Sequence, residues 1–293
     1  MVNFGYACIN ITLDTKTRTA RLETLRNGDC LALLHDLCMQ NLDDLLRIIE
    51  WNYKNNIKVF RISSGIFPHI TNKQLKAKCR YTIDFARPRL AQIGKIARQY
   101  DMRLSFHAMP YVKLGSPSSK VVEDSIAEIE MYADILIELG TKFPVIVLHV
   151  GGVYGDIMAT LNRFYDNFRK LSPRARKLIA LENDELVNCD YILPFCEKHN
   201  ILLVYDVFHN TINATSIPHD ELLRRLQRLW KSRKNRIKFH YSEQRPSARV
   251  GAHGDYVKTI PQWLFKMDAD VMLETKKKEL SIKKLLAHLH HTQ

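Results

Sequence analysis

The 293-residue sequence lacks the marks of a disulfide-rich, zinc-finger or membrane protein. It has no CxxC pair and no stretch of 18 apolar residues, and its start, MVNFGYACIN, has no cationic segment followed by an apolar one. We therefore expect reduced, mostly buried cysteines, which are Cys8, Cys30, Cys38, Cys79, Cys189 and Cys196. These absences predict a soluble, intracellular protein.

Acidic residues are scarce relative to basic ones. Forty-four lysines and arginines against 31 aspartates and glutamates leave a formal net charge of +13. This imbalance favours a polyanionic partner over a neutral metabolite. The alternative is a basic surface that serves only solubility, because net charge does not say where the charges lie.

Short β-branched runs alternate with amphipathic segments along the whole chain, which is typical of a parallel α/β fold. Several runs, such as PVIVLH and ILLVYD, are almost wholly apolar, as strands buried on both faces are. No linker or internal repeat interrupts the pattern, so residues 1–293 are predicted to form one domain, a TIM (β/α)8 barrel. The eight predicted strands are 4–9, 59–62, 104–106, 145–148, 178–181, 202–205, 237–239 and 270–273.

The clearest predicted helix has apolar residues repeating at intervals of four and three from Val122 to Leu136, with Ser119 as a candidate N-cap. A second helical pattern, which contains Leu222 and Leu226, is strongly basic. A proline at position 194 makes the helical pattern over 188–199 less regular.

Imidazole and carboxylate side chains follow six of the eight predicted strands. In an α/β barrel the carboxyl ends of all strands meet on one face, so these side chains are expected to converge there. A single histidine or aspartate at a strand end is usually a satisfied polar residue or a helix cap. Caps would also use serine, threonine and asparagine, so the joint pattern favours a metal centre formed by His107, His149, Glu182, Asp206, His209, His240 and Glu274.

The types of these residues constrain the metal and the reaction. Histidines and carboxylates without a thiolate suit Mn²⁺ or Zn²⁺, and this many ligands fit more than one ion. Two or three neighbouring ions would orient a phosphodiester and activate a water, which predicts phosphate hydrolysis. His253, in the glycine-rich segment RVGAHGD, is a further candidate ligand or phosphate contact.

The chain resembles the UV damage endonucleases over nearly its whole length. The matching segments, in the family's order and spacing, are GYACIN, FRISS, SFH, GSP, LHVGGVYG, ALENDE, YDVFHN, KFH, GAHGDYV and MLETKKKE. The resemblance implies a TIM barrel that uses divalent ions, usually manganese, to nick duplex DNA immediately 5′ of cyclobutane pyrimidine dimers and 6-4 photoproducts. The metal ligands that it implies are His107, His149, Glu182, Asp206, His209, His240, His253 and Glu274.

The resemblance also implies roles for residues outside the ligand set. Lys238 in KFH matches a lysine that the family holds beside the metals in carboxylated form, although an inward-facing ammonium is the alternative. Tyr6 and Asn10 match residues near the metals and the scissile phosphate, although Tyr6 is also plausible as a core aromatic. Lys238, Tyr6 and Glu182 are thus the expected catalytic residues.

Two departures from the family pattern concern one ligand and the lesion-probing loop. Where the family has a histidine after strand two, this chain has Asn72, so either His69, three residues earlier, replaces it or one metal has fewer ligands. Where the family has a glutamine–tyrosine pair, this chain has Pro110 and Tyr111. A proline and an aromatic ring can still hold an unstacked base step open.

The main prediction is therefore a metal-dependent endonuclease acting on damaged double-stranded DNA, as a monomer associated with the nucleoid and without an obligate protein partner or membrane. An apurinic-site nuclease of the endonuclease IV type and a metal-dependent sugar isomerase share the barrel and are the alternatives. A noncatalytic DNA-binding barrel would be basic too, but it would have no use for converging metal ligands.

Overall fold

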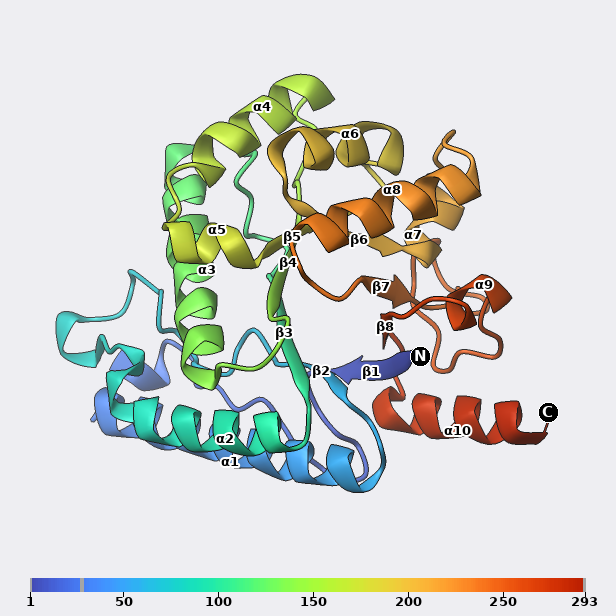
Figure 1. Ribbon diagram of the computed structural model, residues 1–293. Coiled ribbons are helices and arrows are strands. Elements are labelled where there is room, and N and C mark those ends of the chain that lie inside the picture. Colours follow the sequence, from blue (N-terminus) through green and yellow to red (C-terminus); the bar gives the residue numbers. More distant parts are fainter. Residues whose placement is uncertain (1, 27–28, 292–293) are drawn as a thin grey trace.

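The computed structural model describes residues 2–26 and 29–291, and its centre is a closed barrel of eight parallel strands in chain order (Figure 1). Each predicted strand is confirmed and begins within one residue of its predicted start. The predicted TIM barrel is therefore correct. The strands are β1 (Asn3–Ala7), β2 (Val59–Arg61), β3 (Arg103–His107), β4 (Val145–His149), β5 (Ile179–Glu182), β6 (Leu202–Asp206), β7 (Lys238–Tyr241) and β8 (Asp270–Leu273).

Helices surround the barrel and connect its strands (Figure 1). No helix in residues 2–26 and 29–291 is both long and apolar enough to cross a membrane. The α-helices are α1 (Cys30–Lys54), α2 (Arg87–Gln99), α3 (Ser119–Leu139), α4 (Ile157–Phe168), α5 (Pro173–Leu178), α6 (Cys189–His199), α7 (Val207–Ile212), α8 (His219–Ser232), α9 (Gln262–Phe265) and α10 (Lys278–His291). Short 3₁₀ turns are η1 (Thr24–Arg26), η2 (Ala77–Cys79) and η3 (Ile83–Ala86).

Two details of the predicted helices differ. The N-cap of α3 is Ser118, whose hydroxyl accepts a hydrogen bond from the Val121 amide, and the predicted cap Ser119 is the first helical residue. Helix α6 runs through Pro194, which lies on its exposed side. Asn188 caps this helix and its buried apolar residues face the barrel, so packing outweighs the one backbone hydrogen bond that proline removes.

The barrel interior is polar along much of its length. At its base Arg103 forms a buried ion pair with Asp270, at 2.9 Å. One layer further along the strands, the Lys238 amine donates a hydrogen bond to the Ser105 hydroxyl, with an Nζ–Oγ distance of 2.7 Å. The apolar residues on the alternate positions, such as Phe60, pack between the strands and the helices. The core that holds the fold together is therefore mainly the layer outside the barrel, which leaves the inside for polar groups.

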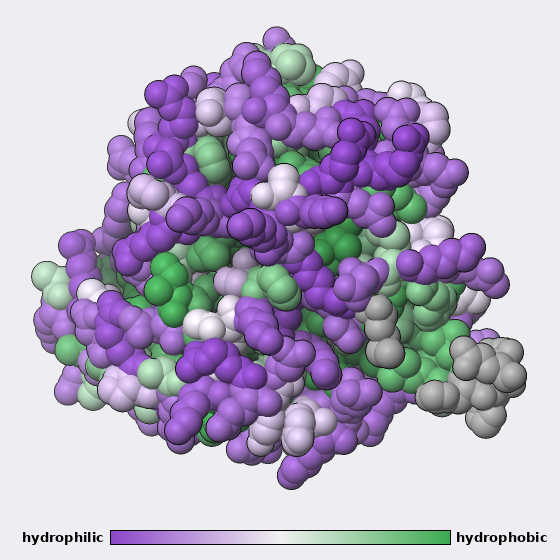
Figure 2. Space-filling model, in the orientation of Figure 1, coloured by the Kyte–Doolittle hydropathy of each residue, from purple (hydrophilic) through white to green (hydrophobic). Residues whose placement is uncertain are grey.

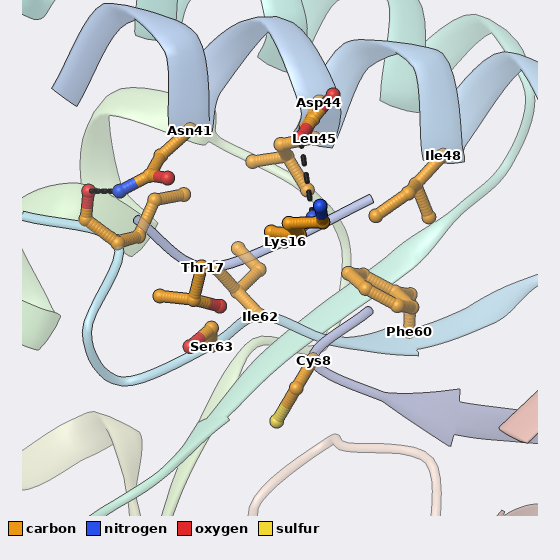
Figure 3. A pocket seen from close by; sticks show the side chains of 11 residues that line it. Cys8, Lys16, Thr17, Asn41, Asp44, Leu45, Ile48, Phe60, Ile62 and Ser63 are labelled. Carbon is orange, nitrogen blue, oxygen red and sulfur yellow. Dashed lines mark hydrogen bonds between the residues drawn. The ribbon is translucent and has the colours of Figure 1, made fainter. Parts of the chain in front are cut away.

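The loop after β1 is held by α1. Asn41 accepts a hydrogen bond from the Arg18 amide and donates to the Ile66 carbonyl, while Asp44 accepts from the Lys16 amide and from the Arg18 guanidinium. Figure 3 shows these α1 side chains above the loop, with a cavity of only about 20 Å³ between them. A void of this size holds about one water, so the loop is packed against its helix.

Cysteine pairing is where the predicted chemistry was wrong. Cys30, at the start of α1, forms a disulfide with Cys79 in η2, with a Cα–Cα distance of 5.4 Å. The other four cysteines are free, and Cys38, Cys189 and Cys196 are buried, as predicted. The 49-residue separation gives no spacing signal, because the pair forms only when the loop after β2 folds back onto α1.

We predict that Cys79→Ala lowers the free energy of unfolding by about 2–4 kcal/mol in the absence of reductant, because the loop of the unfolded chain is no longer closed. Thermal unfolding with and without dithiothreitol measures this effect. Dithiothreitol should lower the Tm of the wild-type protein and leave that of the variant in place. A wild-type Tm that does not respond to dithiothreitol would contradict the prediction.

Candidate metal centre

The carboxyl ends of the strands bring the predicted ligands together in two overlapping groups. The first group consists of His107, Glu182, His240 and Glu274, and the second of Glu182, Asp206 and His209. In each group one potential ligand atom per residue lies within 4.8 Å of all the others. These residues come from β3, β5, β7 and β8, and from the β6–α7 junction, so the barrel alone sets their positions.

Glu182 is common to both groups and is almost completely buried. Its Oε2 lies 2.8 Å from His107 Nε2, and its Oε1 lies 2.6 Å from His240 Nδ1. Both of its oxygens thus contact imidazoles of the first group, and the same carboxylate also belongs to the second group.

Two further histidines flank this pair of groups. His149 Nε2 lies 3.6 Å from Glu182 Oε2. His253 Nδ1 lies 2.9 Å from the backbone oxygen of Glu274, which leaves its Nε2 for another partner. The rings of His209 and His253 are 6.0 Å apart. The structure thus brings both residues to the edge of the centre, outside the two tightest groups.

Unpaired buried atoms test whether these residues fit a metal. Two ligand atoms that are shielded from solvent, Asp206 Oδ2 and His240 Nε2, have no hydrogen-bond partner, and the buried Nδ1 atoms of His149 and His209 face only carboxylates 3.3 Å away. A buried polar atom without a partner is costly, and such atoms are rare in folded proteins. These unpartnered atoms, together with the imidazole and carboxylate chemistry, fit divalent cations.

The carboxylates of the centre have strongly shifted and divergent pKa values. Burial alone would raise the pKa of Glu182, but His240 and His107 hold it well below its ordinary value. Burial raises the pKa of Asp206 well above its ordinary value, and the charges of Glu182 and Glu274 raise it further. Such crowding of carboxylates is relieved when a cation binds among them.

Lys238 lies beneath the two groups, wholly buried. Burial lowers the pKa of its amine well below the ordinary value, and the neighbouring Arg103 and Arg61 charges lower it further. Its Nζ donates to Ser105 Oγ. The buried position of Lys238 beside the candidate metal centre therefore disfavours the charged form of its amine.

The structure favours one of the two alternatives for the ligand after β2. His69 Nε2 lies 2.7 Å from the Ala20 carbonyl oxygen, and its Nδ1 lies 3.2 Å from the side-chain nitrogen of Asn72. Asn72 Oδ1 in turn accepts from the Gln74 amide. Both candidates are thus engaged within the loop, and neither joins the two groups, which favours a centre with fewer ligands on the β2 side.

Tyr6 lies outside the barrel wall and not in the centre. It is opposite Phe60 in the strand register, is wholly buried, and donates its hydroxyl to Asn52 of α1 at 2.7 Å. Asn10 donates to the same hydroxyl, at 2.7 Å. The structure thus places Tyr6 in the core position that was considered as its alternative, because Phe4 and Tyr6 of β1 face the helices.

The loop after β3 places Pro110 and Tyr111 at the surface beside the centre. The Tyr111 side chain is 56% exposed, yet its hydroxyl donates to Glu128 of α3 at 3.3 Å, and Thr71 donates to the same carboxylate oxygen. A cavity of about 180 Å³ separates this loop from His149, with apolar lining from Met109 and Pro110. The loop is therefore exposed but tethered.

Three functional candidates were not found from the sequence. Arg61 at the end of β2 pairs with the ligand Glu274, and its charge holds the pKa of Glu274 below the ordinary value against the opposing effect of burial. Asp184 lies 3.3 Å from His149 Nδ1, and Glu185 lies 3.3 Å from His209 Nδ1. The acidic run ENDE after β5 was the signal for the last two, because both follow Glu182 in the same loop.

A closed parallel barrel with imidazole and carboxylate ligands at its strand ends belongs to the class of metal-dependent TIM-barrel enzymes. The family model described as UV-endonuclease UvdE matches residues 2–293. The chain is 36% identical to a protein of Acanthamoeba polyphaga mimivirus, over 97% of this chain and 90% of that one. The chain belongs to the UV-endonuclease UvdE family.

Two further comparisons agree with this assignment. The UV-damage endonuclease of Schizosaccharomyces pombe is 32% identical over 95% of this chain, which spans only 49% of the yeast protein. The crystal structure of SacUVDE superimposes with a TM-score of 0.88 at 29% identity and covers 100% of this chain and 99% of its own.

We predict that Glu182→Gln weakens Mn²⁺ binding by at least roughly 100-fold. Even substitution of a residue that only hydrogen-bonds to a metal ligand typically costs roughly 10–100-fold in metal affinity. Titration calorimetry of the protein with Mn²⁺ measures the affinity and the number of ions. His69→Ala is the matched control and should bind Mn²⁺ within about twofold of wild type. A large loss of affinity in that control would restore His69 as a ligand.

We predict that Glu128→Leu loosens the loop over residues 108–113, because the Tyr111 and Thr71 hydroxyls lose their common acceptor. Loss of about 1 kcal/mol of hydrogen bonding should speed hydrogen–deuterium exchange of this loop about fivefold. Glu128→Gln, which keeps an acceptor oxygen, should show a smaller effect. Equal exchange in wild type and both variants would contradict the tether.

Proposed function

We propose that this protein is a DNA-repair endonuclease that hydrolyses a phosphodiester of duplex DNA immediately 5′ of cyclobutane pyrimidine dimers and 6-4 photoproducts. Membership of the UV-endonuclease family supports the class of reaction. The observation that carries the proposal is the buried Glu182 shared by two ligand groups at the mouth of the barrel. Such a pair of groups is the arrangement used for in-line displacement at phosphorus.

Divalent ions held by these groups would supply Lewis acidity toward the phosphate and lower the pKa of an attacking water. The chain's own residues would hold the ligand groups in place and orient them toward the phosphate. Glu182 would hold His107 and His240 of the first group in place and would share its carboxylate with the second group. Arg61 would keep Glu274 ionised and aimed into the barrel. A net charge of +13 would attract the DNA backbone.

We propose two Mn²⁺ ions rather than three, because the loop after β2 contributes neither His69 nor Asn72 to the groups. His149 and His253 would complete the coordination from the edges. Lys238 would be carboxylated: a neutral buried amine can add carbon dioxide, and the product would place a carboxylate among the cations.

Recognition of damage would fall to the loop after β3. Pro110 and the exposed ring of Tyr111 would enter the duplex at the lesion and hold the unstacked step open. The cavity beside Met109 would receive displaced bases next to the metal centre. Asn10 is wholly buried and donates to Tyr6, so both would be positioning residues that hold the loop after β1.

Family membership disfavours the two enzymatic alternatives, an apurinic-site nuclease of the endonuclease IV type and a sugar isomerase. The proposed working unit is a monomer of one domain, acting near the nucleoid without an obligate partner. An exposed aromatic wedge and a basic chain suit DNA and have no place in an isomerase.

Two end-labelled duplexes test the proposal, one with a single cyclobutane dimer and one with an abasic site, each incubated with protein and Mn²⁺. The dimer duplex should be cut at the phosphodiester 5′ of the lesion. Glu182→Gln should lower this rate by roughly 10³-fold or more and still bind the duplex, because the basic surface supplies affinity. Cutting of the abasic duplex alone would reject the proposal.

A further inference from the structure

A second basic surface lies on α8, away from the metal centre. Residues 222–236 contain seven lysines and arginines and no aspartate or glutamate. The apolar side of α8, with Leu222, Leu226, Leu229 and Trp230, is buried, and the Trp230 indole donates to the Leu203 carbonyl of β6 at 2.8 Å. Figure 1 shows α8 in the ring of helices outside β6. Its other side therefore faces solvent.

Four of the seven cations form a single exposed row, which we call the α8 ridge: Arg224, Arg228, Lys231 and Lys234. Intervals of four and three residues put Arg224, Arg228 and Lys231 on one side of α8, and Lys234 follows the end of the helix. Figure 2 shows hydrophilic side chains covering the surface over α6 and α8.

The ridge is not neutralised by the rest of the protein. The other three cations have partners within the protein. Arg225 pairs with Glu197, and Arg233 donates to backbone carbonyls. Arg236 pairs with Asp268 and Asp270. No carboxylate in residues 2–26 or 29–291 forms an ion pair with the four ridge residues, and Arg224 contacts only the Asp220 carbonyl. Like charges at these intervals repel one another, so the helix keeps the row at a cost to its own stability.

The shape of the ridge suits a linear polyanion. The helical part of the row, from Arg224 to Lys231, spans about 10 Å, and duplex DNA carries one negative charge per roughly 1.7 Å of its axis. Lys231 and Lys234 also line an open groove of about 870 Å³ together with the Asn235 amide and the carboxylate of Asp268. An unpaired row of cations beside amide groups is how proteins hold the DNA backbone without reading its sequence.

We propose that the α8 ridge is a second, lesion-independent contact for the backbone of duplex DNA. The metal ligands point into the barrel, whereas the ridge points outward from the helix layer, so a straight duplex over the metal centre does not run along the ridge. The ridge therefore holds a different stretch of the same or another duplex and keeps the enzyme on undamaged DNA. This inference rests on the proposed function only in taking DNA as the polyanion.

The test compares two triple variants that carry the same net charge. The ridge variant is Arg224→Gln, Arg228→Gln and Lys231→Gln, and the control removes three exposed, scattered lysines by Lys54→Gln, Lys95→Gln and Lys170→Gln. Fluorescence anisotropy over a range of salt concentrations measures the affinity for a lesion-free duplex of about 60 base pairs. A duplex of about this length can reach both the metal centre and the ridge. Single-turnover nicking of a short dimer-containing duplex is measured in parallel.

The ridge variant should bind the long duplex about tenfold more weakly, with a salt slope lower by about two to three, while the control stays near wild type. Nicking of the short duplex should remain within about twofold of wild type, since the ridge lies outside the metal centre. Equal losses in the two variants, or no loss in the ridge variant, would overturn the inference. So would a ridge variant that loses only binding to poly-L-glutamate, which would assign the ridge to an acidic protein.

The two proposals fail separately. Binding to lesion-free DNA is measured without nicking, so a protein that ignores dimers can still use its ridge. A ridge without effect equally leaves the dimer-directed activity of the metal centre intact.

Discussion

The structure depends on one buried carboxylate, Glu182, which two histidines hold in place from opposite sides of the barrel. An ionised carboxylate loses its hydration when it is buried, and this loss is tolerable only where opposite charges or hydrogen-bond donors replace the water. His107 and His240 provide those donors, while Asp206 nearby lacks a compensating cation and keeps an unpartnered oxygen. The barrel thus holds a cluster of acidic groups whose negative charge bound cations would balance.

This centre stands on a polar interior that begins at the base of the barrel. The Arg103–Asp270 pair fills the lower layer, and Arg103 also donates to the Phe143 and Arg236 carbonyls. Buried ion pairs add little net stability, but they strongly penalise any arrangement that separates them. The pair therefore fixes the position of β3 relative to β8 across the barrel more than it stabilises the fold, and His107 and Glu274 follow on these two strands.

The strand-end ligands could be predicted from sequence because the barrel fixes the relation between chain position and place in space. Six of the eight strands are followed by a candidate ligand, and this pattern needs no knowledge of distant contacts. The position of Tyr6 was harder, because the pattern GYA does not show whether the glycine or the tyrosine faces inward. Gly5 faces inward: an added Cβ would lie 2.5 Å from the Val59 carbonyl oxygen, so Tyr6 must face the helices.

The remaining surprises come from contacts between loops, which have no periodic signal. The Cys30–Cys79 disulfide and the Glu128 acceptor for Thr71 both fix the loop after β2, one at each side. Glu128 also holds Tyr111, so the loop after β3 is anchored to a segment that the disulfide closes. A rigid wedge loses less conformational entropy on entering a duplex than a free loop does. Under the proposed function, damage recognition by this loop would therefore depend on residues behind it, as the chemistry would depend on a carboxylate positioned by histidines.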